Sequence, residues 1–285
     1  SARYKKAFAR HTEKYKEWTA ALVSKDPEVA KTVKVNAGAV YPYDVLKGQI
    51  GHYRQNYNQD NLNHILAQWE ALPNFVGDAN ILPLVDVSGS MTLPAGGYQS
   101  KSKSGVTCLD VAVSLGLYLA DKNKGKFKDT FLTFSSQPQL LMLRGNILDK
   151  IKQMVTSKWE MSTNLHAALD NILQVARNGN VPQEEMPSML LILSDMQFDQ
   201  CAQYDDSAME MIARKYAEAG YAMPNIVFWN LNPHDNVPVK FDDNGVALVS
   251  GFSPSIVKGV LAADLDDFTP EAIMLKTIMN ERYDY

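Results

Sequence analysis

The period of the hydrophobic pattern changes along this chain. Over residues 4–22, apolar and aromatic positions recur at steps of three and four, and Lys and Arg mostly fall off that line, which is typical of an amphipathic helix. Further helical patterns run through residues 43–57 and 61–72. Residues 1–76 therefore predict an all-α segment, either packed on the rest of the protein or forming the end of a larger helical region.

Short apolar strands alternate with helical patterns from residue 80 onward, which predicts a parallel sheet with helices on both faces. The expected strands cover residues 81–87, 130–134, 140–143, 189–193, 226–230 and 246–249. The expected helices cover residues 107–121, 147–155, 165–177, 207–219, 254–262 and 270–280. Residues 241–245 have turn chemistry, so a β-hairpin is expected to lead into the last strand.

A group of oxygen-bearing side chains follows the first predicted strand. Asp86, Ser88 and Ser90 stand at alternate positions directly after the apolar run 81–85. One carboxylate with two hydroxyls suits a hard divalent cation such as Mg²⁺ or Mn²⁺, which prefers oxygen ligands. A short string of this kind also occurs in ordinary polar turns, in which Gly89 supplies flexibility, so the interpretation depends on the rest of the chain.

Two later segments agree with the metal interpretation. Thr163 lies just before an apolar helical face, and Asp195 comes shortly after the buried strand 189–193. With this order and spacing, residues 77–285 resemble von Willebrand factor A (vWA) domains with a metal-ion-dependent adhesion site (MIDAS). The resemblance implies a doubly wound, mostly parallel, Rossmann-like α/β sheet. It also implies that Mg²⁺, with Mn²⁺ or Ca²⁺ as alternatives, is held by Asp86, Ser88, Ser90, Thr163 and Asp195.

The third metal loop departs from the usual pattern of this family. Where vWA domains commonly have Thr-Asp-Gly, this chain has Ser194-Asp195-Met196. The strings 86–91, 194–199 and 249–253 are similar to those of uncharacterised vWA proteins from plants, giant viruses and phages. More distantly, they are similar to the C-terminal domain of the Ro autoantigen (TROVE) RNA-binding proteins.

The resemblance implies a binding module that captures a protein partner through an Asp or Glu carboxylate at an open metal position. One alternative is an RNA-associated scaffold of the Ro type, in which the basic helical segment contacts RNA. A Mg²⁺-dependent phosphoryl-transfer enzyme or nuclease is a second alternative. Neither a Gly-rich phosphate loop with Lys and Ser/Thr nor a Gly-x-Ser-x-Gly motif occurs, and no His/Glu pair points to this site, so we expect no enzyme.

Charge and composition add limits on the partner and the compartment. Residues 1–76 carry 11 Lys/Arg against 7 Asp/Glu, a net charge of +4, and residues 77–285 carry 17 against 25, a net charge of −8. Mixed charges of this kind are typical of solvated surface. No apolar run approaches the ~20 residues of a membrane span and no secretory leader is visible, so we expect no membrane partner. Two cysteines, Cys108 and Cys201, favour reduced thiols and a cytoplasmic protein, or a virion-associated one if viral.

Overall fold

The computed structural model describes residues 2–24, 26, 28–29, 33, 35, 40–50, 59–78, 80–95, 105–160, 164–195, 206–232, 239–241 and 246–250. The chain divides into two compact units, Ser1–Pro73 and Asn74–Tyr285. The first unit is helical in its described part, and the second contains a sheet with helices on both sides.

The first unit consists of α1 (Ala2–Leu22), α3 (Pro42–Val45) and α4 (Gln59–Glu70). The C-terminal half of α1 contacts α4, where Thr19 is fully buried and the Trp18 ring lies 5.5 Å from the His64 ring. The predicted helices over 4–22 and 61–72 are confirmed. The predicted helix over 43–57 is wrong in its described part, because α3 ends at Val45 and the chain turns at Gly48, where φ is +75°. Residues 51–58 of that prediction lie outside the described residues.

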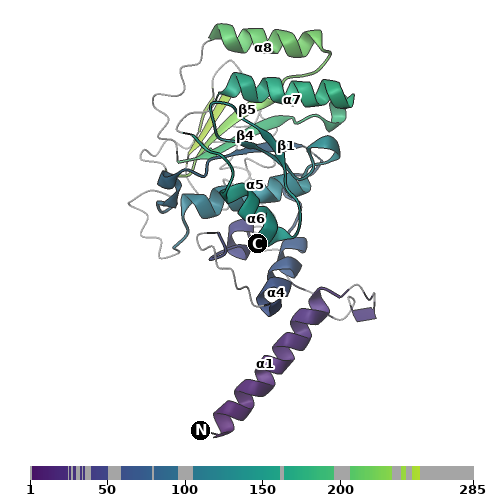
Figure 1. The fold of residues 1–285 in the computed structure, drawn as a ribbon, viewed down its shortest axis with the longest axis vertical. Coiled ribbons are helices and arrows are strands. Elements are labelled where there is room, and N and C mark those ends of the chain that lie inside the picture. Colours follow the sequence, from purple (N-terminus) through teal and green to yellow (C-terminus); the bar gives the residue numbers. More distant parts are fainter. Residues whose placement is uncertain are drawn as a thin grey trace, which may run out of the picture. The chain divides into compact units, whose positions relative to one another are not determined.

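A seven-stranded sheet with the order β3-β2-β1-β4-β5-β7-β6 forms the centre of the second unit (Figure 1). Its strands are β1 (Ile81–Val85), β2 (Thr130–Thr133), β3 (Leu140–Met142), β4 (Met189–Ser194), β5 (Asn225–Asn230), β6 (Val239–Phe241) and β7 (Val246–Ser250). The five inner strands are parallel, and the edge strands β3 and β6 are antiparallel to their neighbours. The predicted mostly parallel α/β sheet is confirmed.

All six predicted strands are present, with bounds that differ by at most two residues. β6 was not predicted as a strand, but a β-hairpin was predicted to lead into the last strand. That hairpin is confirmed, because β6 pairs with β7 in antiparallel register and Phe241 lies opposite Ala247.

Four helices of the second unit cover the two faces of the sheet: α5 (Cys108–Lys122), α6 (Ile147–Val155), α7 (Leu165–Gly179) and α8 (Asp206–Glu218). Figure 1 shows α7 and α8 on one face, and α5 and α6 on the other. These helices confirm the four predictions over residues 107–219. The helices predicted over 254–262 and 270–280 lie outside the described residues.

Local signals in the sequence fix where these helices begin. Thr107 caps α5: its hydroxyl oxygen accepts from the Asp110 N–H, and the Asp110 carboxylate accepts in return from the Thr107 N–H. Asn146 and Asn164 cap α6 and α7 in a similar way with their side-chain oxygens. The first turn of α5 is attached to the segment that follows β1, because the Cys108 N–H donates to the Leu93 carbonyl at 2.9 Å.

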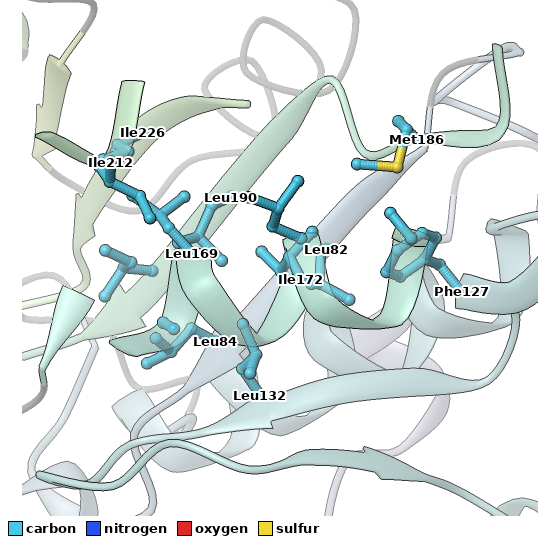
Figure 2. Close-up of a cluster of buried hydrophobic side chains, with 14 of the residues drawn as sticks. Leu82, Leu84, Phe127, Leu132, Leu169, Ile172, Met186, Leu190, Ile212 and Ile226 are labelled. Atoms are coloured by element: carbon cyan, nitrogen blue, oxygen red, sulfur yellow. The ribbon is translucent and has the colours of Figure 1, made fainter. Parts of the chain in front are cut away.

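The core between the sheet and α7 and α8 consists mainly of aliphatic side chains, with a few aromatic ones such as Phe127 (Figure 2). Leu82 and Leu84 of β1 and Leu190 of β4 point to this face and meet Leu169 and Ile172 of α7. Each such side chain contributes about 1.5–3 kcal/mol when it is fully buried. Every residue of β1 and β4 is buried, which explains why these strands read as continuous apolar runs.

Candidate metal-binding site

The first loop of the candidate site begins at Asp86, directly after β1. The Asp86 N–H donates to the Leu193 carbonyl at 3.0 Å, so the pairing of β1 with β4 continues by one residue beyond the strand. The Asp86 carboxylate is 4% exposed and is held by both oxygens. Oδ1 accepts from the Ser88 N–H at 2.8 Å, and Oδ2 accepts from the Ser194 hydroxyl at 2.8 Å. The carboxylate is therefore fixed in orientation by two segments that are far apart in sequence, the first loop and the end of β4.

The two serine hydroxyls of the first loop lie next to each other. Ser88 Oγ and Ser90 Oγ are 3.0 Å apart, and both residues are partly exposed. A short 3-10 turn, η1 (Gly89–Thr92), brings them together. Gly89 has an ordinary φ and open space around its Cα, so this turn does not require the freedom of glycine. The arrangement offers two neutral oxygens beside a buried carboxylate.

Asp195 directly follows β4 and brings a second carboxylate to the same edge. It is 4% exposed, and its Oδ2 atom has no hydrogen-bond partner among the residues that the structure describes. Burial raises the pKa of the Asp86 carboxyl, and the charge of Asp195 adds to this effect, while hydrogen bonds from Ser88 and Ser194 act against it. Two close carboxylates, one with an unsatisfied oxygen, are stabilised by a bound cation.

Thr163, the predicted ligand of the second loop, lies outside the described residues, but both flanks of that loop are placed. The Glu160 N–H donates to the Phe134 carbonyl at 2.9 Å, and the Asn164 N–H donates to the Ser135 carbonyl at 3.2 Å. Phe134 and Ser135 directly follow β2, and β2 is the neighbour of β1. The flanks of the second loop are therefore attached at the carboxyl end of the strand beside Asp86.

The side chain of Glu160 strengthens this attachment. Its Oε2 accepts from the Ser136 N–H at 2.8 Å, and its Oε1 lies 3.1 Å from Lys158 Nζ. The hydrogen bonds from Ser136, followed by the ion pair with Lys158, lower the pKa of Glu160 to about 2. Glu160 therefore carries its charge, and keeps this contact, throughout the physiological pH range.

Two residues of the site were missed in the sequence analysis. Ser194 bonds Asp86, and the only available signal was the hydroxyl residue that vWA domains commonly place before the third-loop Asp. Cys108, the first residue of α5, is a fully buried free thiol whose Sγ lies 3.8 Å from the Pro94 carbonyl. Burial raises the pKa of Cys108 to about 12, with further contributions from the charges of Asp195 and Asp86. Cys108 is thus close enough to the two carboxylates to be affected by their charge.

The topology explains why these groups meet. β1 lies between β2 and β4 in the sheet. The chain passes from β1 to β2 through α5, and it reaches β4 from β3 through α6 and α7. The order of the strands reverses at β1, and ligands bind at the carboxyl ends of strands beside such a point. Asp86, Ser88, Ser90 and Asp195 all lie there. No group of three or more His, Cys, Asp or Glu side chains suited to a metal occurs within the described part of the chain. The oxygen donors at this edge nevertheless fit a hard cation.

The membrane question has a direct structural answer for the described residues: none of their helices combines the length and the apolar character needed to cross a bilayer.

Comparison with known proteins supports the fold and identifies relatives. The chain is 32% identical over 253 residues to the uncharacterized protein L728 of Acanthamoeba polyphaga mimivirus, a match that covers 86% of this chain and 41% of that protein. The crystal structure of the Deinococcus radiodurans RO (RSR) protein is similar, with a TM-score of 0.51 and 14% identity over 85% of this chain and 47% of that one. The chain thus spans less than half the length of either protein.

At 14% identity, the likeness to the RO (RSR) protein is one of fold, and it agrees with a Rossmann-like sheet of the vWA type. The mimivirus protein confirms the expected similarity to giant-virus proteins. A sequence family described as a domain of unknown function, DUF7788, matches residues 80–282, the part that contains the sheet and the candidate metal site. Because this match covers well over half of the sequence, the chain belongs to the DUF7788 family.

Proposed function

We propose that residues 77–285 form a divalent-metal-dependent binding module that captures an acidic residue of a protein partner. The observation that carries the proposal is the meeting of Asp86, Ser88, Ser90 and Asp195 at the carboxyl ends of β1 and β4, with one buried oxygen of Asp195 unsatisfied by the described residues.

The described side chains divide the task of holding an ion. The Ser88 and Ser90 hydroxyls are partly exposed and already paired, so they are direct ligands in the proposal. Asp86 and Asp195 are almost fully buried and neutralise the ion directly or through water. Thr163 completes the set from the second loop. Hydroxyl ligands are neutral, so a bound ion keeps much of its positive charge and supplies an electrophilic position for a carboxylate from outside.

The first test is metal binding itself. Thermal unfolding is followed with EDTA and with millimolar MgCl₂ or MnCl₂, and isothermal titration calorimetry gives the dissociation constant. An ion that binds only the native state raises the unfolding temperature. At an ion concentration 100 times the dissociation constant, the free energy of unfolding rises by about 2.7 kcal/mol. Asp86→Ala should abolish the shift. An unchanged unfolding temperature and no heat of binding for the parent protein would overturn the proposal.

The second test concerns the partner. Proteins retained on the immobilised chain in Mg²⁺ and released by EDTA are identified, and their Asp and Glu residues are substituted in turn. Loss of retention on substitution of one acidic residue supports the proposal. Retention of RNA that falls steeply with salt but survives EDTA would instead assign an RNA contact. Turnover of a phosphodiester substrate that Asp86→Ala abolishes would assign an enzyme.

A further inference from the structure

Ser194 and Asp86 are 108 residues apart in sequence, and their side chains meet at 2.8 Å. Val85 and Leu193 are in register where β1 pairs with β4, so the next residues, Asp86 and Ser194, lie opposite each other. The Asp86 N–H also bonds the Leu193 carbonyl, which extends the register of β1 and β4 by one residue. The backbone therefore places the Ser194 hydroxyl against the carboxylate in a fixed geometry.

The Ser194 hydroxyl differs in its surroundings from the hydroxyls of the first loop. Ser194 is 1% exposed and is the last residue of a buried strand, whereas Ser88 and Ser90 are partly exposed. Because Asp86 Oδ2 is an acceptor, the Ser194 proton is directed at it. Ser194 is thus placed to act through Asp86.

The other oxygen of Asp86 is held by the first loop through the Ser88 N–H. Oδ1 is therefore fixed locally, and Oδ2 is fixed by the strand that carries Asp195. Because each of its two oxygens accepts a hydrogen bond, the Asp86 side chain is held in one rotamer. The strand of Asp195 is itself fixed on its other side, because the Leu231 N–H donates to the Ser194 carbonyl at 2.9 Å. The Ser194 hydroxyl is a direct side-chain link between Asp86 of the first loop and the end of β4, which Asp195 directly follows.

We propose that Ser194 is a positioning residue of the metal site, which sets the orientation of Asp86 and couples the first loop to the third. This inference rests on the proposed function. Groups that orient metal ligands from behind are worth about 10- to 100-fold in metal affinity when they are removed. Ser194→Ala should therefore weaken Mg²⁺ binding by about 10- to 100-fold, while Ser194→Thr, which keeps the hydroxyl on a β-branched side chain suited to a strand, should bind as the parent does.

The experiment measures the Mg²⁺ and Mn²⁺ dissociation constants of the full chain by calorimetry, together with the unfolding temperature in EDTA. Ser114→Ala is the matched control: Ser114 is also fully buried, but its hydroxyl donates to the Asp110 carbonyl within α5 and links no loops. If Ser194→Ala does not fold, Ser194→Thr and Ser194→Val form an isosteric pair that differs only in the hydroxyl.

The outcomes separate the inference from the proposed function. Weaker metal binding in Ser194→Ala or Ser194→Val, with parent-like binding in Ser194→Thr and Ser114→Ala, supports the positioning role. Equal binding by Ser194→Ala and the parent overturns it while the metal site stands. Equal weakening in Ser114→Ala also overturns it, because the effect is then one of general stability. A parent protein that binds neither ion overturns the proposed function itself.

Discussion

Gly116 of α5 lies so close to Val85 of β1 that a Cβ built on the glycine is 2.6 Å from Val85 Cγ2 and 3.3 Å from Met154 Sδ. The helix therefore packs on the central strand through a position that has no side chain. Val85 is the last residue of β1 and directly precedes Asp86, so this close approach helps to place the start of the candidate site.

Gly116→Ala should destabilise the protein even though alanine favours helices. Overpacking of a dense core costs about 1–3 kcal/mol, and the gain in helix propensity returns about 1 kcal/mol. We expect a net loss of up to about 2 kcal/mol in denaturant unfolding. Gly89→Ala is the control, because that glycine has an ordinary φ and open space, and its effect on stability should stay within about 0.5 kcal/mol. Equal stability of Gly116→Ala and the parent would show that the helix shifts freely.

The side chain of Asn123 hydrogen-bonds the backbone N–H and carbonyl of Ile81, the first residue of β1, as a paired strand would. Its Oδ1 accepts from the Ile81 N–H and its Nδ2 donates to the Ile81 carbonyl, both at 2.9 Å, and Asn123 is 2% exposed. Asn123→Ala leaves both backbone groups buried without these partners, and each unsatisfied group costs about 1–3 kcal/mol. We expect a loss of about 2–6 kcal/mol in the free energy of unfolding. Asn123→Asp keeps the acceptor for the Ile81 N–H but sets a second oxygen against the Ile81 carbonyl in a buried place, so it should also lose stability. An alanine variant as stable as the parent would contradict this explanation.

The sequence predicted the elements well where one period dominates. The strands at 81–85 and 189–194 are buried on both faces and read as continuous apolar runs, so periodicity and length identify them. The helix at 147–155 was predicted with its observed bounds, and in the structure Asn146 and Asp149 form a capping box at its start. The strand at 239–241 was not predicted as a strand, whereas β3, an edge strand of the same length, was, so shortness alone does not explain the difference.

The candidate site was predictable only as a set of candidates. Asp86, Ser88 and Ser90 are close in sequence, so their spacing reveals them. Their placement at the same edge as Asp195 depends on the order of strands in the sheet, which local pattern does not encode. The bond from Ser194 to Asp86 depends further on the exact register of β1 with β4. The domain boundary near residue 76 and the metal-ligand roles of Asp86, Ser88, Ser90, Thr163 and Asp195 stay predictions.

The ion pair between Asp170 of α7 and Lys215 of α8 should give a small pH-dependent contribution to stability. Lys215 Nζ lies 3.0 Å from Asp170 Oδ1, and this contact lowers the pKa of Asp170. A lowered folded-state pKa gives stability that is present above the unfolded pKa and is lost as the pH falls through the folded-state value. Because both side chains are partly exposed, Asp170→Asn should cost only about 0.5 kcal/mol at pH 7.

The difference between Asp170→Asn and the parent should narrow as the pH falls below about 4. A double-mutant cycle with Lys215→Met isolates the pair from other effects of each substitution. A difference that grows toward low pH would contradict the assigned cause.

Cys108 should be chemically silent in the native protein. The thiol is fully buried at the first turn of α5, and its pKa is raised to about 12, so almost no thiolate is present at pH 8. In a Cys201→Ser background, which leaves Cys108 as the single thiol of the chain, labelling by iodoacetamide should be at least about 100-fold slower than in urea, because reaction requires local opening of the site.

The rate of Cys108 labelling should also depend on whether the metal site is occupied. Cys108 is close enough to Asp86 and Asp195 for their charges to raise its pKa, so an ion held by those carboxylates should suppress the opening that exposes the thiol. Labelling should slow further on addition of Mg²⁺ in the Cys201→Ser protein, and it should not respond to Mg²⁺ when Asp86→Ala is added. Fast labelling of the native protein in EDTA would show that the thiol is open to solvent, and a Mg²⁺ response that persists in Asp86→Ala would place the ion elsewhere.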